Sequence, residues 1–417
     1  MGKIVITGGR KLSGRIKIPG AKNTVLPILA ATLISGKKSI IIDCPKIKDV
    51  ELTLEILKDL GCKISWEEDL LIIDSSDIRK TDIKEELMDK MRSSIILTGA
   101  VLSRMGEVRT TYPGGCELGL RPIDLHIKAF KKMGIFVEEK FGYINFKKNK
   151  QKDSEIHLDF PSVGATENIM LAASTHKGKT KIINAAKEPE IEDLQKFLCK
   201  MGVKVSGAGT SVIEIVGTNT FYEVTHKVIP DRIVASTYMV AGAITDGDVI
   251  LENVNYNHIS SVAAVMDAMG VEFEFTSDHS IRVKGNGALK SNNLIRTLPY
   301  PGFPTDAQSI IMSLLSIAKG TGMIIENIFD SRFKHVEELK KMGADITISD
   351  RCAVIKGVKK LYGARVNAPD LRSGAGLVVA GLCADGVTEV SNTHYIRRGY
   401  EDIVRDLQSL GADIIYK

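Results

Sequence analysis

One pattern of hydrophobic and polar positions returns six times along the chain, at a spacing of roughly 70 residues. In each copy, a helix with one apolar and one charged face ends in Leu-Gly or Met-Gly, and a strand follows. The glycines of these pairs are Gly61, Gly134, Gly202, Gly270, Gly343 and Gly411. Glycine ends a helix readily because it enters the left-handed conformation without a steric penalty from Cβ. The repetition predicts six similar α/β units.

A second helix precedes the amphipathic one in each unit and is apolar on nearly all of its faces. Residues 28–33 and 310–315 are examples. We expect each of these helices to be closed by its own glycine: Gly36, Gly106, Gly178, Gly247, Gly320 and Gly386. Helices that are apolar all round are buried, whereas helices with a charged face lie outside. Each unit is therefore expected to run helix, strand, helix, strand.

The repeats are expected to assemble into two similar domains. Parallel strands need a crossover helix, and three units can bury three apolar helices against one another with the sheets outside. The N-terminal strand precedes the first repeat, and the midpoint of the chain falls near residues 229–231, so we expect a two-domain body hinged near residues 19–20 and near residues 229–231. A generic α/β chain whose helices happen to end in glycine is the alternative interpretation.

Composition narrows the class of protein. The chain has 417 residues, 44% of them hydrophobic and 26% charged, which is typical of a globular protein with more than one core. A net charge of +5 without a long run of like charges gives little support to nucleic-acid binding. The six cysteines form no CxxC pair, so no metal site is predicted. Without a signal peptide or an 18-residue apolar run, we expect a cytoplasmic protein with reduced thiols.

Known cofactor loops are absent from the sequence, so the candidate chemistry lies in short polar clusters. The first is 19–23, Pro-Gly-Ala-Lys-Asn, just ahead of an apolar helix. Lys22 would add a point charge to the free N–H groups of the helix N-terminus, an arrangement that suits a phosphate or carboxylate. A solvated lysine is the alternative interpretation.

The second cluster, at 112–126, holds three glycines in a short span and is predicted to be a lid over a ligand. Cys116 would be accessible on such a loop. Arg121 would favour its thiolate form and can also bind an anion. The alternative is an inert, structural cysteine.

The third group consists of acids and arginines in the second half of the chain. Asp306 and Asp370 each precede an apolar helix, Arg372 follows Asp370, and Arg332 and Arg398 precede charged helices. Simple helix capping is the alternative for a single aspartate. Because the clusters occupy equivalent places in their repeats, we expect them to share one cavity between the domains.

Together these motifs resemble the UDP-N-acetylglucosamine 1-carboxyvinyltransferase family, the enolpyruvyl transferases of peptidoglycan synthesis, over essentially the full length. The resemblance rests on 19–23, 113–116, 121–126, 162–170, 188–191, 304–306, 332–335, 370–372 and 398–401. It implies an inside-out α/β barrel in each of two three-repeat domains, the first at residues 22–229 and the second at residues 1–21 plus 230–417. The N-terminal strand would thus return to the second domain, and the substrate cleft would lie between the domains. It implies transfer of the enolpyruvyl group of phosphoenolpyruvate to the 3′-hydroxyl of UDP-N-acetylglucosamine, without a metal or organic cofactor.

The resemblance also implies site residues. Phosphoenolpyruvate contacts fall on Lys22, Asn23, Arg121, Arg332 and Arg398. UDP-N-acetylglucosamine contacts fall on Arg92, Arg121, Pro122, Ile123, Asp124, Leu125, Ser162, Val163, Gly164, Asp306 and Ile328. Some members carry a lysine just before the segment at Ser162, whereas this chain reads Asp159-Phe160-Pro161.

The implied reaction needs a base for the sugar hydroxyl, a proton for C3 of phosphoenolpyruvate, and cations for its carboxylate and phosphate. The hypothesis is that Asp306 is the base and Cys116 the acid, with a covalent phospholactoyl adduct on Cys116 as a further step. Lys22 and the arginines, among them Arg398, would neutralise the anions. Asp370 and Arg372 would orient this network.

Three rival functions are considered. The sister enzyme that acts on 3-phosphoshikimate has a lysine-serine pair after its first Pro-Gly and no lid cysteine, unlike Lys22-Asn23 and Cys116. RNA 3′-terminal phosphate cyclase resembles the repeat but needs a nucleotidylated histidine, whereas His126 and His335 lie in the transferase motifs. A catalytically silent paralogue that binds the sugar nucleotide as a regulator is the third.

Overall fold

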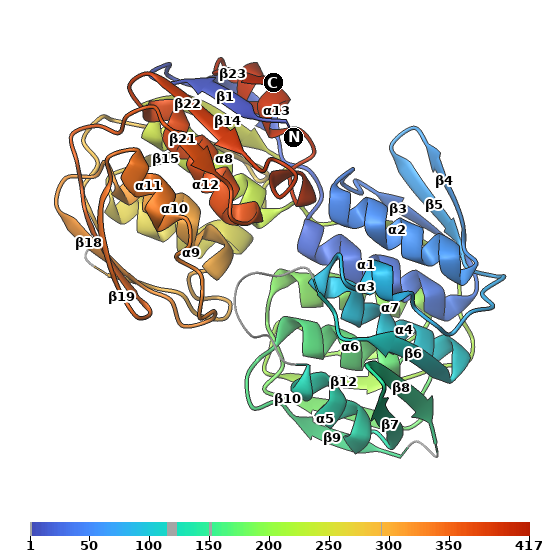
Figure 1. Cartoon of the computed structure of the whole chain (residues 1–417). Coiled ribbons are helices and arrows are strands. Elements are labelled where there is room, and N and C mark those ends of the chain that lie inside the picture. The colour runs from blue at the N-terminus through green and yellow to red at the C-terminus, as the bar shows by residue number, and fades with distance from the viewer. Residues whose placement is uncertain (1, 115–122, 150–151, 293) are drawn as a thin grey trace. The chain divides into compact units, whose positions relative to one another are not determined.

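The computed structural model describes residues 2–114, 123–149, 152–292 and 294–417 (Figure 1). It divides into two compact units. The first unit runs from Gly20 to Ile229, and the second unit combines the N-terminal residues up to Pro19 with Pro230–Lys417. Both units are α/β, and the described residues form six small sheets, three in each unit.

The sheets of the first unit have the strand orders β13-β3-β5-β4, β6-β8-β7 and β11-β12-β10-β9. Their strands are β3 (Lys38–Ile42), β4 (Lys63–Glu67), β5 (Leu70–Asp74), β6 (Glu107–Thr111), β7 (Ile135–Lys140), β8 (Tyr143–Lys148), β9 (Ser154–His157), β10 (Lys179–Ile183), β11 (Lys204–Ser206), β12 (Val212–Val216) and β13 (Val224–Lys227). The pairs β13–β3 and β9–β10 are parallel, and the other neighbours in these sheets are antiparallel.

Three apolar helices form the core of the first unit: α1 (Lys22–Ser35), α4 (Ile96–Met105) and α6 (Val163–Ala173). They are buried along most of their length and contact one another. The remaining helices are α2 (Lys48–Leu60), α3 (Glu85–Met88), η1 (Arg92–Ile95), α5 (Asp124–Lys132) and α7 (Pro189–Met201). The longer ones, α2, α5 and α7, bury one face and expose a charged one, as their patterns predict.

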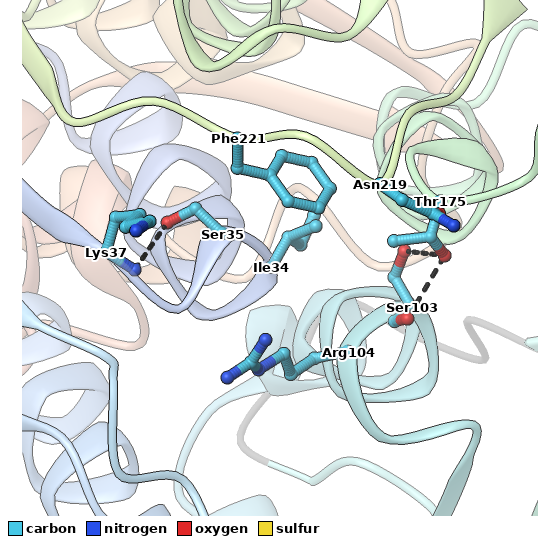
Figure 2. A pocket seen from close by; sticks show the side chains of 8 residues that line it. All are labelled: Ile34, Ser35, Lys37, Ser103, Arg104, Thr175, Asn219 and Phe221. Atoms are coloured by element: carbon cyan, nitrogen blue, oxygen red, sulfur yellow. Dashed lines mark hydrogen bonds between the residues drawn. The ribbon is translucent and has the colours of Figure 1, made fainter.

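A cavity of about 340 Å³ lies at the C-terminal ends of α1, α4 and α6. Figure 2 shows Ser103 beside Thr175 on one side and Phe221 above Ile34. Because α1 rises about 1.5 Å per residue, this cavity is roughly 20 Å along the helix from Lys22. It is therefore separate from the residues that the sequence assigns to chemistry.

The sheets of the second unit have the orders β21-β22-β1-β23, β15-β16-β14-β2 and β17-β18-β20-β19. Their strands are β1 (Ile4–Thr7), β2 (Ser13–Lys17), β14 (Asp248–Glu252), β15 (Glu272–Ser277), β16 (Ser280–Lys284), β17 (Ile295–Arg296), β18 (Thr321–Ile325), β19 (Asp345–Ser349), β20 (Cys352–Lys356), β21 (Arg365–Asn367), β22 (Val387–Ser391) and β23 (Asp413–Tyr416). The N-terminal strand β1 lies between β22 and β23, antiparallel to both, and β2 is parallel to β14.

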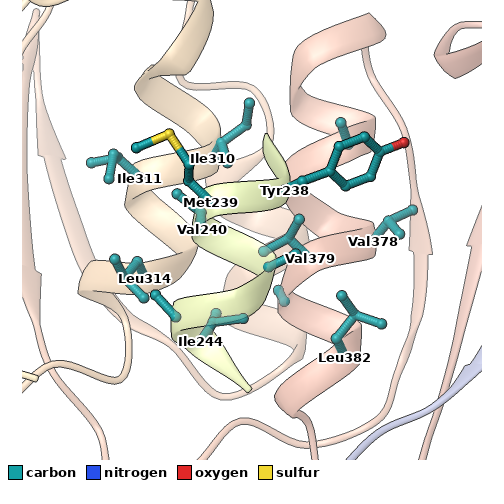
Figure 3. Close-up of a cluster of buried hydrophobic side chains, with 14 of the residues drawn as sticks. Tyr238, Met239, Val240, Ile244, Ile310, Ile311, Leu314, Val378, Val379 and Leu382 are labelled. Atoms are coloured by element: carbon teal, nitrogen blue, oxygen red, sulfur yellow. The ribbon is translucent and has the colours of Figure 1, made fainter. Parts of the chain in front are cut away.

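The core of the second unit is built from α8 (Arg232–Ile244), α10 (Gln308–Leu315) and α12 (Leu371–Cys383). Figure 3 shows their side chains meeting, with Val240 of α8 between Ile311 of α10 and Val379 of α12. The other helices are α9 (Tyr256–Ala268), η2 (Thr305–Ala307), α11 (Val336–Lys341), η3 (Ile396–Arg398) and α13 (Ile403–Ser409).

The predicted helix ends are confirmed only in part. All six glycines of the Leu-Gly and Met-Gly pairs have a positive φ, between 80° and 119°. Gly36 and Gly106 are the C-caps of α1 and α4. The expectation was wrong for Gly178, Gly247, Gly320 and Gly386, since α6, α8, α10 and α12 end several residues earlier.

Five of the repeats also contain a strand that the sequence pattern missed. The strand after the amphipathic helix turns back into an antiparallel hairpin, as in β4–β5, β7–β8, β11–β12, β15–β16 and β19–β20. In the sixth repeat, β1 takes the place of that second strand beside β23.

Within the described residues, no helix combines the length and the apolar character needed to cross a membrane. Five cysteines fall in this part of the chain, and all of them are free thiols. Burial raises the pKa of Cys62 and that of Cys383 to about 12. These two thiols are therefore poor nucleophiles at neutral pH.

Candidate active site

Polar residues lie at the N-terminal ends of the six buried helices, and all of those named here except Asp231 were singled out in the sequence. In the first unit, Lys22 begins α1, Arg92 begins the turn that leads into α4, and Ser162 caps α6. In the second unit, Asp231 caps α8, η2 with Asp306 leads into α10, and Asp370 caps α12. The sequence places them there because a short polar segment precedes each apolar helix.

A network of charges surrounds Asp306 in the second unit. One carboxylate oxygen of Asp306 accepts a hydrogen bond from Nη2 of Arg332 at 3.1 Å, and the other lies 3.4 Å from Nε of Arg372. Both arginines are almost fully buried, with exposed side-chain fractions of 2% and 3%. Buried guanidinium groups need partners of opposite charge, so this geometry fixes the direction of the Asp306 carboxylate.

Asp370 joins the same network from the start of α12. Its Oδ1 accepts from the backbone N–H groups of Arg372 and Ser373, and its Oδ2 accepts from the Ser373 hydroxyl at 2.6 Å. Nη1 of Arg332 lies 3.9 Å from Oδ1. Burial opposes the charge of Asp370, yet Arg332 and these hydrogen bonds leave its pKa below the usual value. Asp370 is thus both a helix cap and a partner of Arg332.

His335 is buried beside this network with 1% of its surface exposed. Burial lowers its pKa to about 4, and the charge of Arg332 acts in the same direction, although Asp370 partly opposes both. The imidazole is therefore neutral at physiological pH. It precedes α11 and lies three residues beyond Arg332 in the sequence.

Arg372 is also held from its other side. Its guanidinium carbon lies 5.9 Å from the ring of Tyr400, whose hydroxyl is hydrogen-bonded to that of Thr237 at 2.7 Å. Asp306, Arg332, Asp370 and Arg372 therefore meet in one cluster.

Two further expected site residues belong to the second unit. Arg398, two residues before Tyr400, is the last residue of η3. The backbone N–H of Ile328 donates to a carboxylate oxygen of Glu326 at 2.8 Å.

In the first unit, Lys22 forms a buried ion pair that the sequence did not reveal. Its Nζ lies 2.8 Å from Oδ2 of Asp49, in the first turn of α2, and the two side chains are 12% and 2% exposed. Asn23 follows Lys22 in α1. Within the described ranges, no side chain caps the N-terminus of α1, so Lys22 stands beside backbone N–H groups that carry positive partial charge.

A second cluster of the first unit joins α5, α6 and the turn before α4. Asn168 of α6 donates to the carbonyl of Ile95 at 3.0 Å and accepts from the N–H of Gly99 at 2.7 Å. Its Nδ2 is also 2.9 Å from Nδ1 of His126. An added Cβ on Gly164 would lie only 3.6 Å from Cε1 of His126. Asn168 and His126 therefore fix the start of α6 against α5.

This cluster places several of the expected sugar-nucleotide residues close together. Ile123, Asp124 and Leu125 begin α5, directly ahead of His126, and Val163 and Gly164 follow Ser162 in the first turn of α6. The Ser162 hydroxyl accepts from the N–H of Ala165 at 3.3 Å. Burial lowers the pKa of His126 to about 4, and the nearby charge of Arg92 adds to this effect.

Arg92 donates to the carbonyl of Pro113, near the start of the predicted lid segment 112–126, at 3.3 Å. Cys116, Arg121 and Pro122 lie outside the described residues. In place of the lysine that some members carry before Ser162, Asp159 forms an exposed ion pair with Lys128 at 2.6 Å.

Sequence reasoning missed Asp49, Asn168 and Glu326. Each is buried, at 2%, 0% and 1% exposure. A buried polar side chain must be hydrogen-bonded, and a polar residue at an apolar position of a repeat is the signal that could have found it. Within the described part of the chain, no group of His, Cys, Asp and Glu side chains is arranged to hold a metal ion.

Comparisons with known proteins agree over the whole chain. Residues 6–407 match the family model described as EPSP synthase (3-phosphoshikimate 1-carboxyvinyltransferase). A UDP-N-acetylglucosamine 1-carboxyvinyltransferase 2 of Caldanaerobacter subterraneus is 49% identical, covering 100% of this chain and 99% of the relative. The UDP-N-acetylglucosamine 1-carboxyvinyltransferase of Halothermothrix orenii is 47% identical, covering 99% of each chain.

Solved structures share the fold at lower identity. The enolpyruvyl transferase NikO of Streptomyces tendae has a TM-score of 0.90 at 23% identity, covering 100% of this chain and 99% of its own. An EPSP synthase of Acinetobacter baumannii has a TM-score of 0.76 at 19% identity, covering 100% of both chains.

Proposed function

Because this chain belongs to the UDP-N-acetylglucosamine 1-carboxyvinyltransferase family, we propose that it transfers the enolpyruvyl group of phosphoenolpyruvate to the 3′-hydroxyl of UDP-N-acetylglucosamine, releasing phosphate. The observation that carries this proposal is identity of 49% and 47% to relatives of that name over nearly their full length. The reaction would be the first committed step of peptidoglycan synthesis. We place the protein in the cytoplasm, where both substrates are made.

The reaction proceeds by addition and elimination. The oxygen of the sugar 3′-hydroxyl bonds to C2 of phosphoenolpyruvate and gives up its proton, while C3 takes up a proton. C3 then loses a proton, the bond between C2 and the phosphate oxygen breaks, and the double bond returns. The protein must supply a base, an acid and cations for the substrate anions.

We assign the base to Asp306 of the second unit. Its carboxylate is 26% exposed, whereas the arginines behind it are buried, so it is the reachable part of the cluster. Arg332 and Arg372 hold its direction, and Asp370 in turn holds Arg332. Arg332 and Arg398 would contact phosphoenolpyruvate. Asp370 and Arg372 act through their neighbours.

The first unit supplies further groups for the same reaction in this proposal. Lys22, Asn23 and Arg121 would bind phosphoenolpyruvate, with the uncapped N-terminus of α1 adding positive partial charge. UDP-N-acetylglucosamine would contact Arg92, the residues from Arg121 to Leu125, and Ser162 to Gly164, together with Asp306 and Ile328 of the second unit.

Cys116 is the proposed acid for C3. Cys116→Ala should abolish turnover and leave the Kd for UDP-N-acetylglucosamine unchanged, and an epoxide such as fosfomycin should alkylate the wild type but not the variant. Loss of both turnover and binding would instead identify a structural cysteine. Cys199→Ala, which removes the exposed thiol of the first unit, is the matched control.

We also propose that each unit is an inside-out α/β barrel of three repeats, with domain boundaries at 22–229 and at 1–21 plus 230–417. Three buried helices in each unit, with small sheets made from the intervening strands, support this arrangement.

The test is release of inorganic phosphate from phosphoenolpyruvate with each of two acceptors. Release with UDP-N-acetylglucosamine alone is the expected result. The description of the matching family model favours 3-phosphoshikimate as the second candidate acceptor. Release with that acceptor alone would identify the activity as that of a 3-phosphoshikimate 1-carboxyvinyltransferase. No release, combined with tight sugar-nucleotide binding, would identify a silent regulator.

A further inference from the structure

Glu326 is a buried carboxylate that joins two loops of the second unit. It follows β18, and only 1% of its surface is exposed. Its Oε1 accepts from the backbone N–H groups of Ile328 and Phe329 at 2.8 and 3.1 Å, and from the hydroxyl of Thr297 at 2.9 Å. Its Oε2 accepts from the hydroxyl of Thr305 at 3.0 Å. One side chain therefore receives four hydrogen bonds from three segments.

The two loops that meet at Glu326 carry residues with different roles. Thr305 immediately precedes Asp306, the proposed base. Ile328 is an expected contact of UDP-N-acetylglucosamine, whose hydroxyl that base must deprotonate. The carbonyl of Thr305 also accepts from Arg332 at 3.3 Å, so Glu326 and Arg332 hold the same turn from two sides.

The connection is short and rigid. From Asp306 to the backbone of Ile328 it passes only through Thr305 and the Glu326 carboxylate. Each bond has a heavy-atom distance typical of a good hydrogen bond, and buried hydrogen bonds leave little freedom to the groups that make them. A displacement of about 1 Å between a base and its substrate can cost roughly a hundredfold in rate.

We propose that Glu326 is a positioning residue, which sets the distance between the base loop at Asp306 and the loop at Ile328, an expected contact of the sugar nucleotide. This inference rests on the proposed function, because both assignments belong to it. Glu326 itself touches neither the substrate nor the reacting atoms. Its contribution is the fixed geometry of the two loops.

Three substitutions separate the two connections. Thr305→Val removes only the bond to the base loop, and kcat should fall roughly tenfold while the Kd for UDP-N-acetylglucosamine stays within about twofold. Glu326→Ala releases both loops, and it should lower kcat at least as far and raise that Kd roughly tenfold. Glu326→Gln keeps an oxygen for the two backbone N–H groups, so it should restore most of the binding and turnover.

The control for lost stability is Thr245→Val. Thr245 is buried at the C-terminal end of α8, where its hydroxyl donates to the carbonyl of Ala241 at 2.8 Å. This variant should lower the Tm and leave kcat and Kd unchanged. Kd is measured by calorimetry with UDP-N-acetylglucosamine alone, and kcat by phosphate release across pH, because a displaced base changes the acidic limb of the profile.

The outcomes separate the two claims. If wild type turns over but Glu326→Ala and Thr305→Val lose only stability, as Thr245→Val does, Glu326 is a structural residue and the proposal is overturned. If Glu326→Ala does not fold, an unchanged kcat in Thr305→Val is sufficient to overturn the proposal. If the wild type binds the sugar nucleotide but releases no phosphate, the proposed function fails, and with it the inference.

Discussion

The two units share an architecture but treat the N-terminal ends of their buried helices differently. In the second unit, Asp231 and Asp370 cap α8 and α12, so carboxylates occupy the helix N–H groups. In the first unit, no side chain among the described residues caps the N-terminus of α1, and α6 is capped by the Ser162 hydroxyl. The N-terminus of α1 thus keeps backbone donors for an anion, whereas α8 and α12 use theirs to hold aspartates; α10 of the second unit resembles α1 in having no side-chain cap within the described residues.

The cations differ in the same way. Arg332 and Arg372 in the second unit are paired with Asp306 and Asp370 inside one cluster. In the first unit, Lys22 forms an ion pair with Asp49. The comparison teaches that one repeat can serve two purposes. In the second unit, buried arginines fix the direction of a carboxylate, whereas in the proposed function the first unit binds a negatively charged ligand.

The largest expected effect is a loss of turnover, and it comes from Asp306 of the second unit. Asp306→Asn removes the proposed base but keeps the shape of the side chain, so turnover should fall by roughly 10²- to 10⁴-fold. Binding of UDP-N-acetylglucosamine should persist, which calorimetry would detect. Asp248→Asn, at a partly exposed ion pair with Arg282 in the same unit, should retain normal turnover. Normal turnover in Asp306→Asn would reassign the base.

Acidification should lower the stability of both units. His126 and His335 have folded-state pKa values of about 4, below the unfolded value of about 6.5. The unfolded chain therefore binds more protons between these values, so stability is complete above about pH 6.5 and is lost as the pH falls toward 4. Each histidine should contribute about 3 kcal/mol to this loss.

Urea unfolding at several pH values measures this effect. Between pH 6.5 and 4, His126→Gln should reduce the slope of the unfolding free energy against pH through the first unit. His335→Gln should reduce it through the second unit. His279→Gln, at an exposed histidine, is the control and should leave the slope unchanged. An equal slope in all three variants would contradict the assignment.

The hydrogen bonds of Asn168 should contribute to the stability of the protein and, of the two substrates, only to the binding of UDP-N-acetylglucosamine. Asn168→Ala leaves the N–H of Gly99 without its acceptor, and the free energy of unfolding should fall by about 2 kcal/mol. The Kd for UDP-N-acetylglucosamine should rise because α5 and the start of α6 lose their common partner. Ser174→Ala removes a buried hydroxyl just after α6 and should change stability alone. An unchanged Kd in Asn168→Ala would make Asn168 purely structural.

The smallest expected effect concerns the ion pair of the first unit. Asp49→Asn keeps the size of the side chain but takes away the charge that holds Lys22, so the KM for phosphoenolpyruvate should rise by roughly three- to tenfold. Steady-state kinetics with saturating sugar nucleotide measures it. Asp59→Asn, at an acid paired with Lys80 and Lys84 in the same unit, is the control. Equal KM values for both variants would show that Asp49 does not affect the binding of phosphoenolpyruvate.

The repeat and the ends of its amphipathic helices could be predicted from the sequence because both are local, whereas four of the six glycines expected to close the apolar helices lie beyond the helix ends. Leu-Gly and Met-Gly pairs end helices through the conformation of one residue, and all six glycines have the expected positive φ. The hairpin strands were missed because a segment such as β5 (Leu70–Asp74) is short and nearly all apolar, and its pattern does not distinguish a second strand from a loop.

The contacts that complete the candidate site are not local. Asn168 meets His126 across 42 positions of sequence, and Glu326 meets Thr305 across 21. Nothing in the spacing of one motif indicates which distant loop will lie beside it. The types of chemical group could be predicted from the motifs, but their partners follow from how the repeats fold against one another.

The most direct test is to incubate the protein in D₂O with phosphoenolpyruvate and equal amounts of UDP-N-acetylglucosamine and 3-phosphoshikimate, and to identify the product by NMR and mass spectrometry. The account predicts an enolpyruvyl ether on the 3′-oxygen of the sugar nucleotide, with deuterium in its vinyl group and one phosphate released per product. An ether on 3-phosphoshikimate, or a sugar-nucleotide product without deuterium, would contradict it.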